Sequence, residues 1–415
     1  MANKKIVAWA LYDLANTAFT SPFATIFWPL LVVSYAGGNE FQIGATVSIS
    51  ILIFSLIIPI LGIISDNTNL RKPFIVIPTL VMILIIGVLP WTNLYWNLVL
   101  AGIATVMYNL SLSIYNSILP TLGSEEEIGK ISGIGMASGF IGTILSLFVA
   151  YLTLNYFASH SLFGNFATKT LETEIGVKAV FPVVSIFFLI FSLPFMFIYK
   201  DDKVKKLTLE SKKIISKIAG TLKGMFRIKG MLPFMIFLGL ISNAFAAIDI
   251  FFFLYAKKEV GMMLSDFIFL FMAQSVGACC GALIFGKLSD KYGSKSMLRI
   301  STVLWIIVIG AFIISKNMQV FWIAGLAGSI ALGASLANSR TLFVFISPSN
   351  KMGEFFGYSQ IISRLLALFG PFIGGWLIIK SGYNSALVMI IGFIVASLFF
   401  LEKTPDFRAR KQKIS

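Results

Sequence analysis

The sequence predicts an all-α membrane protein with 12 transmembrane helices in two parallel, pseudo-symmetric six-helix halves. The chain of 415 residues is 57% hydrophobic and only 12% charged, and its mean hydropathy is +0.89. Soluble domains are nearer half apolar and about a quarter charged. We find about twelve apolar runs, each close to the roughly 20 residues that cross a bilayer. Lipid is therefore the expected solvent of most of the chain.

A repeated segment indicates that the two halves arose by duplication. Gly62-Ile63-Ile64-Ser65-Asp66 recurs as Gly286-Lys287-Leu288-Ser289-Asp290, at an offset of 290 − 66 = 224 residues, and the same offset carries Arg71 onto Lys295. Because an even number of spans separates the copies, the halves are expected to repeat in parallel about an axis along the membrane normal. Substrate is then expected to bind between the halves.

The apolar runs fix the order of the spans and the side of the termini. They begin near positions 8, 42, 73, 98, 131, 179, 231, 264, 296, 319, 354 and 384. An even number of spans leaves both termini on one side, and about 25 of the 33 Lys and Arg residues follow the termini and the even-numbered loops. We expect a multi-pass protein of a prokaryotic cytoplasmic membrane with both termini cytoplasmic.

A basic segment divides the apolar runs six and six. It gives three predicted parts: an N-terminal half at 1–199, a cytoplasmic linker at 200–230 and a C-terminal half at 231–415. In the linker, apolar residues recur every four positions beside lysines, which indicates an amphipathic helix on the anionic membrane surface. A solvated linker is the alternative.

Several classes of protein are disfavoured by the composition. A formal net charge of +15 would suggest a nucleic-acid partner in a soluble protein, but here the cations follow the alternating loops. The single histidine, His160, excludes a multi-histidine metal site, and the adjacent Cys279 and Cys280 point apart on a helix. Neither a nucleotide-binding loop nor a paired nucleophile and base is present. We therefore expect no enzyme activity, no cofactor, no metal and no nucleic acid.

Polar residues concentrate in the first, fourth, seventh and tenth spans. Polar groups inside a membrane are costly, at roughly 2.5 to 3.5 kcal/mol for a charge, so such stripes indicate shielded helix faces. For a single asparagine, a helix-to-helix hydrogen bond is as good an explanation as substrate contact. The candidate substrate or coupling residues in these spans are Asp13, Asn16, Asn109, Tyr115, Asn116, Asn243 and Arg340.

The eleventh span adds Gln360 and Arg364, which lie four residues apart on one helix face. An arginine about ten residues into a span needs a partner. Asp13 is one candidate partner, for either Arg340 or Arg364. Alternatively, either arginine clamps a substrate carboxylate with its forked donors.

The repeated segments are candidate gating motifs. A glycine at Gly62 is expected to let helices approach closely, and Asp66 is expected to accept hydrogen bonds from exposed amides of another helix and from Arg71. Simple capping of its own loop is the alternative for Asp66. The second copy consists of Gly286, Asp290 and Lys295.

Several segments together resemble one branch of the major facilitator superfamily, the unknown major facilitator family, which is related to the vacuole effluxer of autophagy. The segment from Tyr12 to Phe19, Tyr-Asp-Leu-Ala-Asn-Thr-Ala-Phe, is similar to that family's opening Tyr-Asp-Trp-Ala-Asn-Ser-Ala. Leu14 departs from it, as does Asn243-Ala244 where the family tends to carry Asn-Asp-Gly. Further matching segments are Tyr115 to Pro120, Gly129 to Gly135, Ser339-Arg340, Glu354 to Gly357, Arg364 and Gly370-Pro371.

The resemblance implies the major facilitator fold, a cavity lined by the first, fourth, seventh and tenth spans, and a cytoplasmic latch that breaks on each cycle, with Asp66 near Glu354 to Gly357. It also implies secondary transport, and amino-acid efflux is the activity attached to the vacuolar relatives. We therefore expect a monomeric secondary active transporter that moves a small polar or zwitterionic solute, with protons exchanged through Asp13 and membrane lipids as further partners. The alternative is a pump for amphipathic drugs, since the 40 phenylalanines would supply a greasy cavity. A lipid scramblase or membrane-embedded enzyme is the remote alternative.

Overall fold

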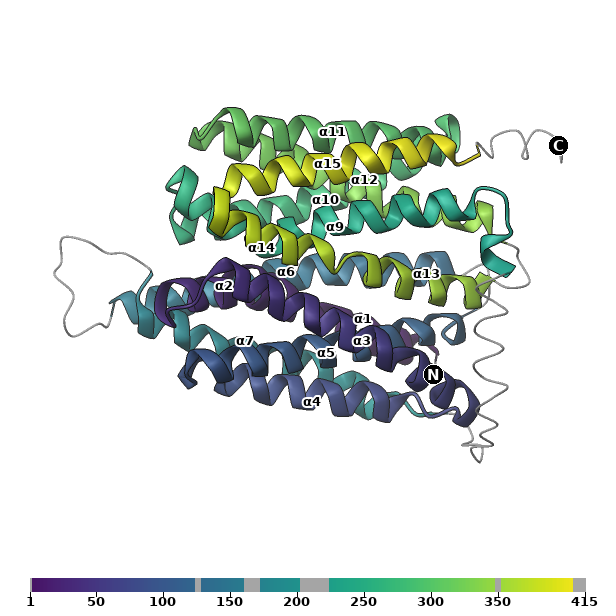
Figure 1. The fold of residues 1–415 in the computed structure, drawn as a ribbon. Coiled ribbons are helices and arrows are strands. Elements are labelled where there is room, and N and C mark those ends of the chain that lie inside the picture. The colour runs from purple at the N-terminus through teal and green to yellow at the C-terminus, as the bar shows by residue number, and fades with distance from the viewer. Residues whose placement is uncertain (1, 124–127, 160–171, 202–223, 348–351, 406–415) are drawn as a thin grey trace. The chain divides into compact units, whose positions relative to one another are not determined.

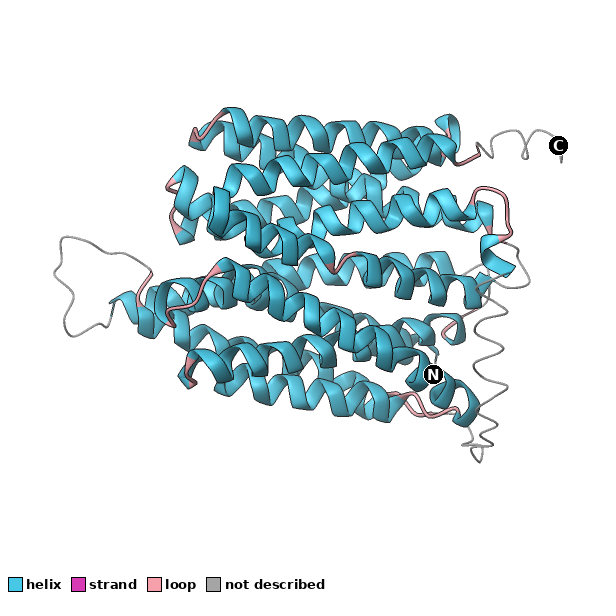
Figure 2. Ribbon diagram, viewed as in Figure 1, coloured by secondary structure: helices cyan, strands magenta, loops and turns pink. Residues whose placement is uncertain are grey.

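A computed structural model of the chain describes residues 2–123, 128–159, 172–201, 224–347 and 352–405. Within these ranges all regular structure is helical, as Figure 2 shows, and 12 helices are long and apolar enough to cross a membrane. The predicted fold class is confirmed. Most of the basic linker, including its proposed amphipathic helix, and His160 lie outside the described residues.

The spans follow the predicted order (Figure 1). The first consists of α1 (Ala2–Ala18), the π-helix η1 (Phe19–Phe27), α2 (Trp28–Leu30) and a second π-helix, η2 (Leu31–Tyr35). Spans two to six are α3 (Glu40–Thr68), α4 (Lys72–Val88), α5 (Leu94–Ile118), α6 (Ile128–Ser159) and α7 (Glu174–Ile198). Spans seven to twelve are α9 (Met231–Tyr255) with the π-helix η5 (Ala256–Val260), α10 (Leu264–Tyr292), α11 (Ser294–Ile314), α12 (Met318–Ile346), α13 (Met352–Leu366) with α14 (Phe369–Ser381), and α15 (Tyr383–Lys403).

Prolines lie at the irregular parts of the first and eleventh spans. Pro22 lies inside η1 and Pro29 inside α2. A proline cannot donate the helical hydrogen bond and its ring crowds the preceding turn, so the backbone widens locally into π-helical turns. The eleventh span is interrupted between Leu366 and Phe369, just before Pro371.

The helices group into two compact units. Unit 1 contains residues 1–208 and 249–272, and unit 2 contains residues 209–248 and 273–415. In unit 1, α4 packs against α5 and α7; in unit 2, α11 packs against α12 and α15. These pairs occupy equivalent places in the two sequence repeats, so each unit repeats the same local packing. The division of the sequence at residues 199 and 230 stays a prediction about the repeats, because the unit boundary passes through α9 and α10.

Close approach between helices occurs at glycines other than those predicted. A Cβ atom on Gly142 of α6 would collide with the carbonyl oxygen of Leu14 in α1, and one on Gly333 of α12 would collide with that of Ala278 in α10. A Cβ on Gly62 or Gly286 would meet nothing within 4 Å. The structure therefore shows no close contact at either motif glycine, and the role expected of Gly62 stays a prediction. In α10 the tight crossing lies earlier in the helix, at Gly277 and Gly281, which face α12.

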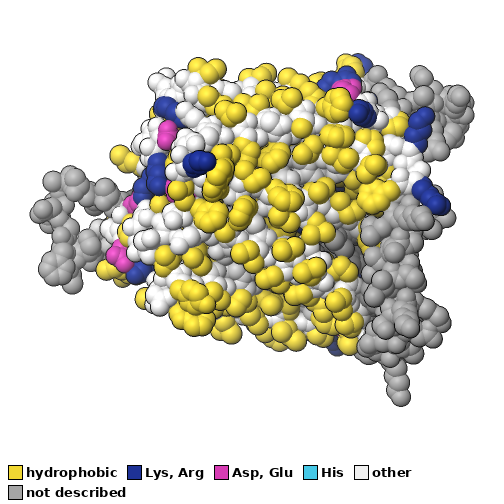
Figure 3. All heavy atoms as spheres, viewed as in Figure 1, with side chains coloured by type: hydrophobic (Ala, Val, Ile, Leu, Met, Phe, Trp, Pro, Cys, Tyr) yellow, Lys and Arg dark blue, Asp and Glu magenta, His cyan; other side chains and the backbone are white. Residues whose placement is uncertain are grey.

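The outer surface of the helices is apolar, as a lipid-facing surface must be. Large hydrophobic side chains such as Leu56, Leu84 and Phe197 are more than two-thirds exposed. Figure 3 shows hydrophobic side chains spread along the helices in view, with charged side chains gathered toward the helix ends. In a bilayer, apolar helix surfaces of this kind suit contact with lipid hydrocarbon. The chain is an integral, multi-pass membrane protein.

Candidate functional site

An aromatic cluster fastens α1 to its neighbours in unit 1. Trp9 stacks on Tyr115 with ring centroids 4.8 Å apart, and Tyr12 lies 4.9 Å from Tyr115. The Tyr115 hydroxyl donates to the Trp9 carbonyl oxygen at 2.8 Å, while the Tyr12 hydroxyl lies 2.5 Å from the hydroxyl of Thr79 in α4. Tyr115 is fully buried. Its ring and hydroxyl therefore hold α5 to α1, which is a structural use of this candidate residue.

Asp13 lies beside this cluster on the face of α1 that meets α6. Its side chain is half-buried, and Oδ2 is 3.1 Å from the position that a Cβ atom of Gly135 would take. The methyl group of Thr17, one turn later, lies 3.4 Å from the equivalent position at Gly139. The glycines of α6 thus leave room for the polar stripe of α1. A carboxylate in a span is costly enough to call for a functional explanation.

The three candidate asparagines of unit 1 differ in how their side chains are used. Asn109 is buried and donates from Nδ2 to the carbonyl oxygen of Thr105 in its own helix, at 2.8 Å. Asn116 is exposed. Asn16 is only 2% exposed, yet neither its Nδ2 nor its Oδ1 has a hydrogen-bond partner among the described residues. Buried polar atoms nearly always find a partner, so Asn16 retains capacity to bind water or solute.

Asn243 of α9 is committed to the break in the eleventh span. Its Nδ2 donates to the carbonyl oxygens of Gly239, at 2.9 Å, and of Leu366, and its Oδ1 accepts from the backbone N–H of Gly370 at 2.7 Å. Leu366 ends α13 and Gly370 lies in the first turn of α14. The side chain therefore satisfies backbone groups that the break would otherwise leave without partners in the membrane. This contact lies entirely within unit 2.

We expect Asn243→Ala to destabilise the protein, because it leaves the carbonyl oxygen of Leu366 and the N–H of Gly370 without their side-chain partner at the helix break. Each orphaned group costs about 1–3 kcal/mol. Thermal unfolding of the purified protein in detergent should show a midpoint several degrees below that of the unmodified chain. Asn109→Ala is the matched control, since the hydrogen bond of Asn109 stays within its own helix. Equal midpoints for the two variants would contradict the bridging role.

The two candidate arginines of unit 2 lie in different settings. Arg340 is exposed on α12. Arg364 is half-buried in the last turn of α13, and its side chain makes no hydrogen bond or ion pair with any residue that the structure describes. The side chain of Gln360, one turn earlier, is not described. A pairing of Asp13 with either arginine would join different units and stays a prediction.

The first gating motif shows an anchoring contact that the sequence did not reveal. The backbone N–H groups of Arg71 and Lys72 donate to the Asp201 carboxylate, at 3.0 and 2.9 Å. Asp201 follows the end of α7 and here caps the start of α4, where a negative charge is favoured by the helix dipole. An acidic residue directly after the sixth span was the available signal. The structure places Asp66 in the last turn of α3 but does not describe its side chain, so its latch role stays a prediction.

The second gating motif fastens α11 to the end of α15. Lys295 is buried, and its ammonium donates to the carbonyl oxygens of Glu402 at 3.0 Å and Thr404 at 2.7 Å. Arg299, one turn later, donates to the Glu402 carboxylate at 2.7 Å. Asp290 is exposed. Lys295 thus stabilises unit 2 internally, as Asp201 does in unit 1, and a gating role for the second motif stays a prediction.

Comparison with known proteins identifies the family. Residues 41–413, about nine-tenths of the chain, match the family described as vacuole effluxer Atg22 like. The chain belongs to this family. It is 21% identical over 402 residues to the uncharacterized MFS-type transporter YxiO of Bacillus subtilis (strain 168), with 94% of this chain and 92% of YxiO covered. The family resemblance seen in the sequence is therefore confirmed.

Two further likenesses place this Atg22-like protein among major facilitator transporters. It is 25% identical over 414 residues to the multi-drug resistance efflux pump PmrA homolog of Lactococcus lactis subsp. lactis (strain IL1403), with 95% of this chain and 93% of that protein covered. The structure of a D-xylose-proton symporter matches the fold with a TM-score of 0.73 at 18% identity, over 98% of both chains. The protein is a secondary transporter of the major facilitator type and not an enzyme.

Ion pairs hold one end of the Atg22-like fold within unit 1. Lys258 in η5 contacts Glu40, with Nζ and Oε1 2.6 Å apart, and Lys257 pairs with the carboxylate of Glu172 and lies 3.3 Å from the hydroxyl of Ser34. Glu40 is only 5% exposed, at the first turn of α3, where a capping box made by Asn39 and Gln42 begins the helix. The sequence analysis missed these pairs. Their available signal was a pair of lysines at the end of the seventh span, against the positive-inside pattern.

Proposed function

We propose that this Atg22-like transporter exports a small polar or zwitterionic, amino-acid-like solute by alternating access and exchanges it for protons through Asp13. The observation that carries the proposal is the polar face of α1, where a half-buried carboxylate lies one turn from a buried asparagine with unused hydrogen-bonding groups. Such a face is costly in a membrane unless it binds ions, water or solute. The description of the family as effluxers supports the outward direction.

The chemistry of the two units suits a zwitterion. Arg364 supplies a planar fork of N–H donors that fits a carboxylate, and it has no competing ion pair among the described residues. Asn16 supplies an amide oxygen and Asp13 a carboxylate, both of which accept from an ammonium group. The groups of unit 1 complement the ammonium of such a solute, and the group of unit 2 complements its carboxylate. An uncharged sugar would leave the arginine without a charged partner.

Proton exchange follows from a carboxylate that faces each side of the membrane in turn. When Asp13 faces the outside, it would take up a proton, and the neutral side chain would cross with the rearranging helices at lower cost than a charge. Facing the cytoplasm, it would release the proton and become able to bind a cationic group. The inward proton gradient would then drive the solute outward. Both termini and the basic linker lie on the cytoplasmic side in this proposal.

Export of amphipathic drugs is the second candidate function, favoured by the likeness to a multi-drug efflux pump homologue. Against it, the large aromatic side chains beside Asp13 are fastened to one another by stacking and hydrogen bonds rather than left free to adapt to varied ligands. Counterflow in proteoliposomes separates the two functions. The proposal expects exchange of labelled amino acids and none of cationic dyes, and the reverse result would overturn it.

The ion pairs of Glu40 and Lys258 suggest a gate. Loops between spans one and two and between spans seven and eight lie on the same side of the membrane, since an even number of spans separates them. We propose that the Lys258 and Lys257 pairs close the outer side of the transporter and break when it opens outward. Glu40 is buried, so loss of its charge leaves Lys258 without its partner and weakens the closed state.

We expect Glu40→Gln to increase opening on the outer side. The reporter is Val32→Cys in a background with both native cysteines changed to serine, because Val32 is fully buried near the start of α3. Labelling by a membrane-impermeant maleimide should rise several-fold in Glu40→Gln. In the charge exchange Glu40→Lys with Lys258→Glu, labelling should fall back to the level of the reporter protein without these changes. Glu174→Gln is the control, since Glu174 pairs with Lys178 in its own helix. Unchanged labelling in Glu40→Gln would count against the gate.

A further inference from the structure

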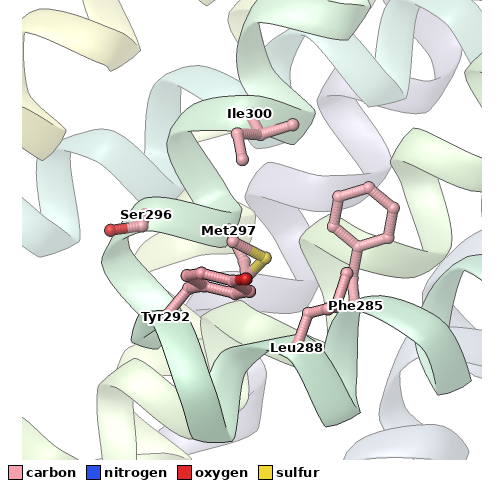
Figure 4. A pocket seen from close by; sticks show the side chains of 6 residues that line it. All are labelled: Phe285, Leu288, Tyr292, Ser296, Met297 and Ile300. Atoms are coloured by element: carbon pink, nitrogen blue, oxygen red, sulfur yellow. The ribbon is translucent and has the colours of Figure 1, made fainter.

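The hairpin between α10 and α11 encloses a cleft that the transport mechanism does not use. The cleft has a volume of about 370 Å³ and is lined by Phe285, Leu288, Tyr292, Ser296, Met297 and Ile300. Figure 4 shows Leu288, Tyr292 and Met297 grouped between the two helices, with Phe285 and Ile300 beside them. Sites for small organic ligands span roughly 300–1,000 Å³. The cleft is thus large enough for part of a ligand, and its walls are mainly apolar.

The cleft opens onto the apolar surface of the helices. Leu288, Tyr292 and Ile300 are 37%, 43% and 49% exposed, so the lining is continuous with the surface that lipid must cover. The three α10 residues fall at positions 285, 288 and 292, one face of a helix. The turn at Gly293, with a φ of 85°, reverses the chain and brings the start of α11 against that face. The occupant must therefore tolerate hydrocarbon surroundings.

Two exposed lysines of α10 lie toward the loop end of the hairpin that forms the cleft. Lys287 and Lys291 are exposed in the last turns of α10, and the ammonium of Lys291 lies 5.2 Å from the centroid of the Tyr292 ring that lines the cleft. Between residues 287 and 299 the chain carries four cations and the single anion Asp290. Two of those cations, Lys295 and Arg299, are already occupied by the end of α15. Lys291, through its contact with Tyr292, places a positive charge beside the apolar wall of the cleft, and Lys287 lies one turn earlier on the same helix.

We infer that this cleft binds an anionic phospholipid, with acyl chain along the apolar wall and phosphate at Lys287 and Lys291. An apolar body with one negative headgroup is the chemistry that complements both parts of the site. Basic pockets between transmembrane helices on the cytoplasmic side are suited to anionic headgroups, and the orientation proposed above puts the hairpin there. The inference rests on that orientation but not on the identity of the transported solute.

The test compares lipids and variants in the purified full-length protein. Phosphatidylglycerol added to the detergent should raise the thermal midpoint more than phosphatidylcholine does, because a ligand that binds only folded protein stabilises it with occupancy. The double variant Lys287→Gln with Lys291→Gln should lose the difference between the lipids. The control, Lys316→Gln with Lys380→Gln, removes two charges from the opposite ends of helices in the same unit and should keep it. Equal shifts from the two lipids, or a double variant that keeps the difference, would overturn the inference.

A second measurement needs no variant. A photoactivatable phosphatidylglycerol, cross-linked to the unmodified protein in detergent, should label peptides that contain residues 285–300. Excess unlabelled phosphatidylglycerol should suppress that labelling at least several-fold, and excess phosphatidylcholine should not. Labelling confined to other segments, or equal suppression by both lipids, would overturn the inference even if the double variant failed to fold.

Discussion

Asp13→Asn should abolish solute accumulation driven by a pH gradient, while solute exchange without a gradient continues. Asparagine has nearly the same size and shape as a protonated aspartate, so the α1 face beside Gly135 should keep its packing. It cannot release or take up a proton, however, and the transport cycle then loses its coupling step. The expected loss of accumulation is total, and counterflow should persist at a reduced rate, because the amide oxygen of asparagine still accepts from the solute's ammonium group without the charge of a carboxylate.

The measurement uses proteoliposomes with an imposed pH gradient and a labelled solute that shows counterflow in the unmodified protein. Asp249→Asn is the matched control, since Asp249 is the other carboxylate well inside a described span and is exposed on α9. The control should accumulate solute as the unmodified protein does. Full gradient-driven accumulation by Asp13→Asn would show that coupling lies elsewhere, and equal fractional losses of accumulation and counterflow would contradict a role of Asp13 in proton coupling.

The positions of the spans were readable from the sequence because the bilayer itself imposes them. Hydrocarbon about 30 Å thick requires long apolar helices with satisfied backbone groups, whatever the tertiary packing. The runs predicted to begin near 131, 231 and 264 begin at Ile131, Met231 and Leu264 in the candidate spans. The family motifs then gave the superfamily, since they cover both halves.

The roles of individual polar residues were not readable, because the same residue type serves two purposes in a membrane. Asn16 and Asn243 both lie in polar stripes of α1 and α9, yet Asn16 has unused hydrogen-bonding atoms and Asn243 closes a helix break. That break lies beside Gly370 and Pro371 of another span, so the residues next to Asn243 in the sequence do not predict its contact with the break. The ion pair between Lys258 and Glu40 likewise joins residues 218 positions apart.

The glycine motifs show a related limit. A glycine allows close packing but does not cause it, so the sequence alone cannot tell which glycines lie at a helix crossing. Gly142 and Gly333 lie at crossings, whereas Gly62 and Gly286 have open space around them. Lys295 was a candidate because it corresponds to Arg71 in the sequence repeat. In the structure its ammonium binds the carbonyl oxygen of Thr404, just after the end of α15. Repetition at a fixed offset therefore identified a conserved fold position of the duplicated halves, without revealing its chemistry.

Arg364→Ala should reduce transport at least roughly 30-fold, since removing one partner of a buried, hydrogen-bonded charge pair costs about 2–5 kcal/mol. Arg364 lies 12 residues after the start of α13, about 18 Å along the helix. A half-buried arginine at that depth, without an ion pair among the described residues, is costly unless a charged group reaches it. A solute carboxylate is the group that we propose.

The variant Arg364→Lys distinguishes the contribution of the planar guanidinium from that of the positive charge, because lysine keeps the charge and lacks the paired N–H donors. If two parallel N–H donors hold a carboxylate, lysine should restore only part of the lost flux, mainly through a raised KM. Arg299→Ala is the control, because Arg299 is an exposed arginine of the same unit that is held by Glu402 at a helix end. It should lower stability slightly and leave the KM unchanged. Normal flux in correctly inserted Arg364→Ala would remove this residue from the binding site, and equal losses in Arg364→Ala and Arg299→Ala would reduce its role to stability.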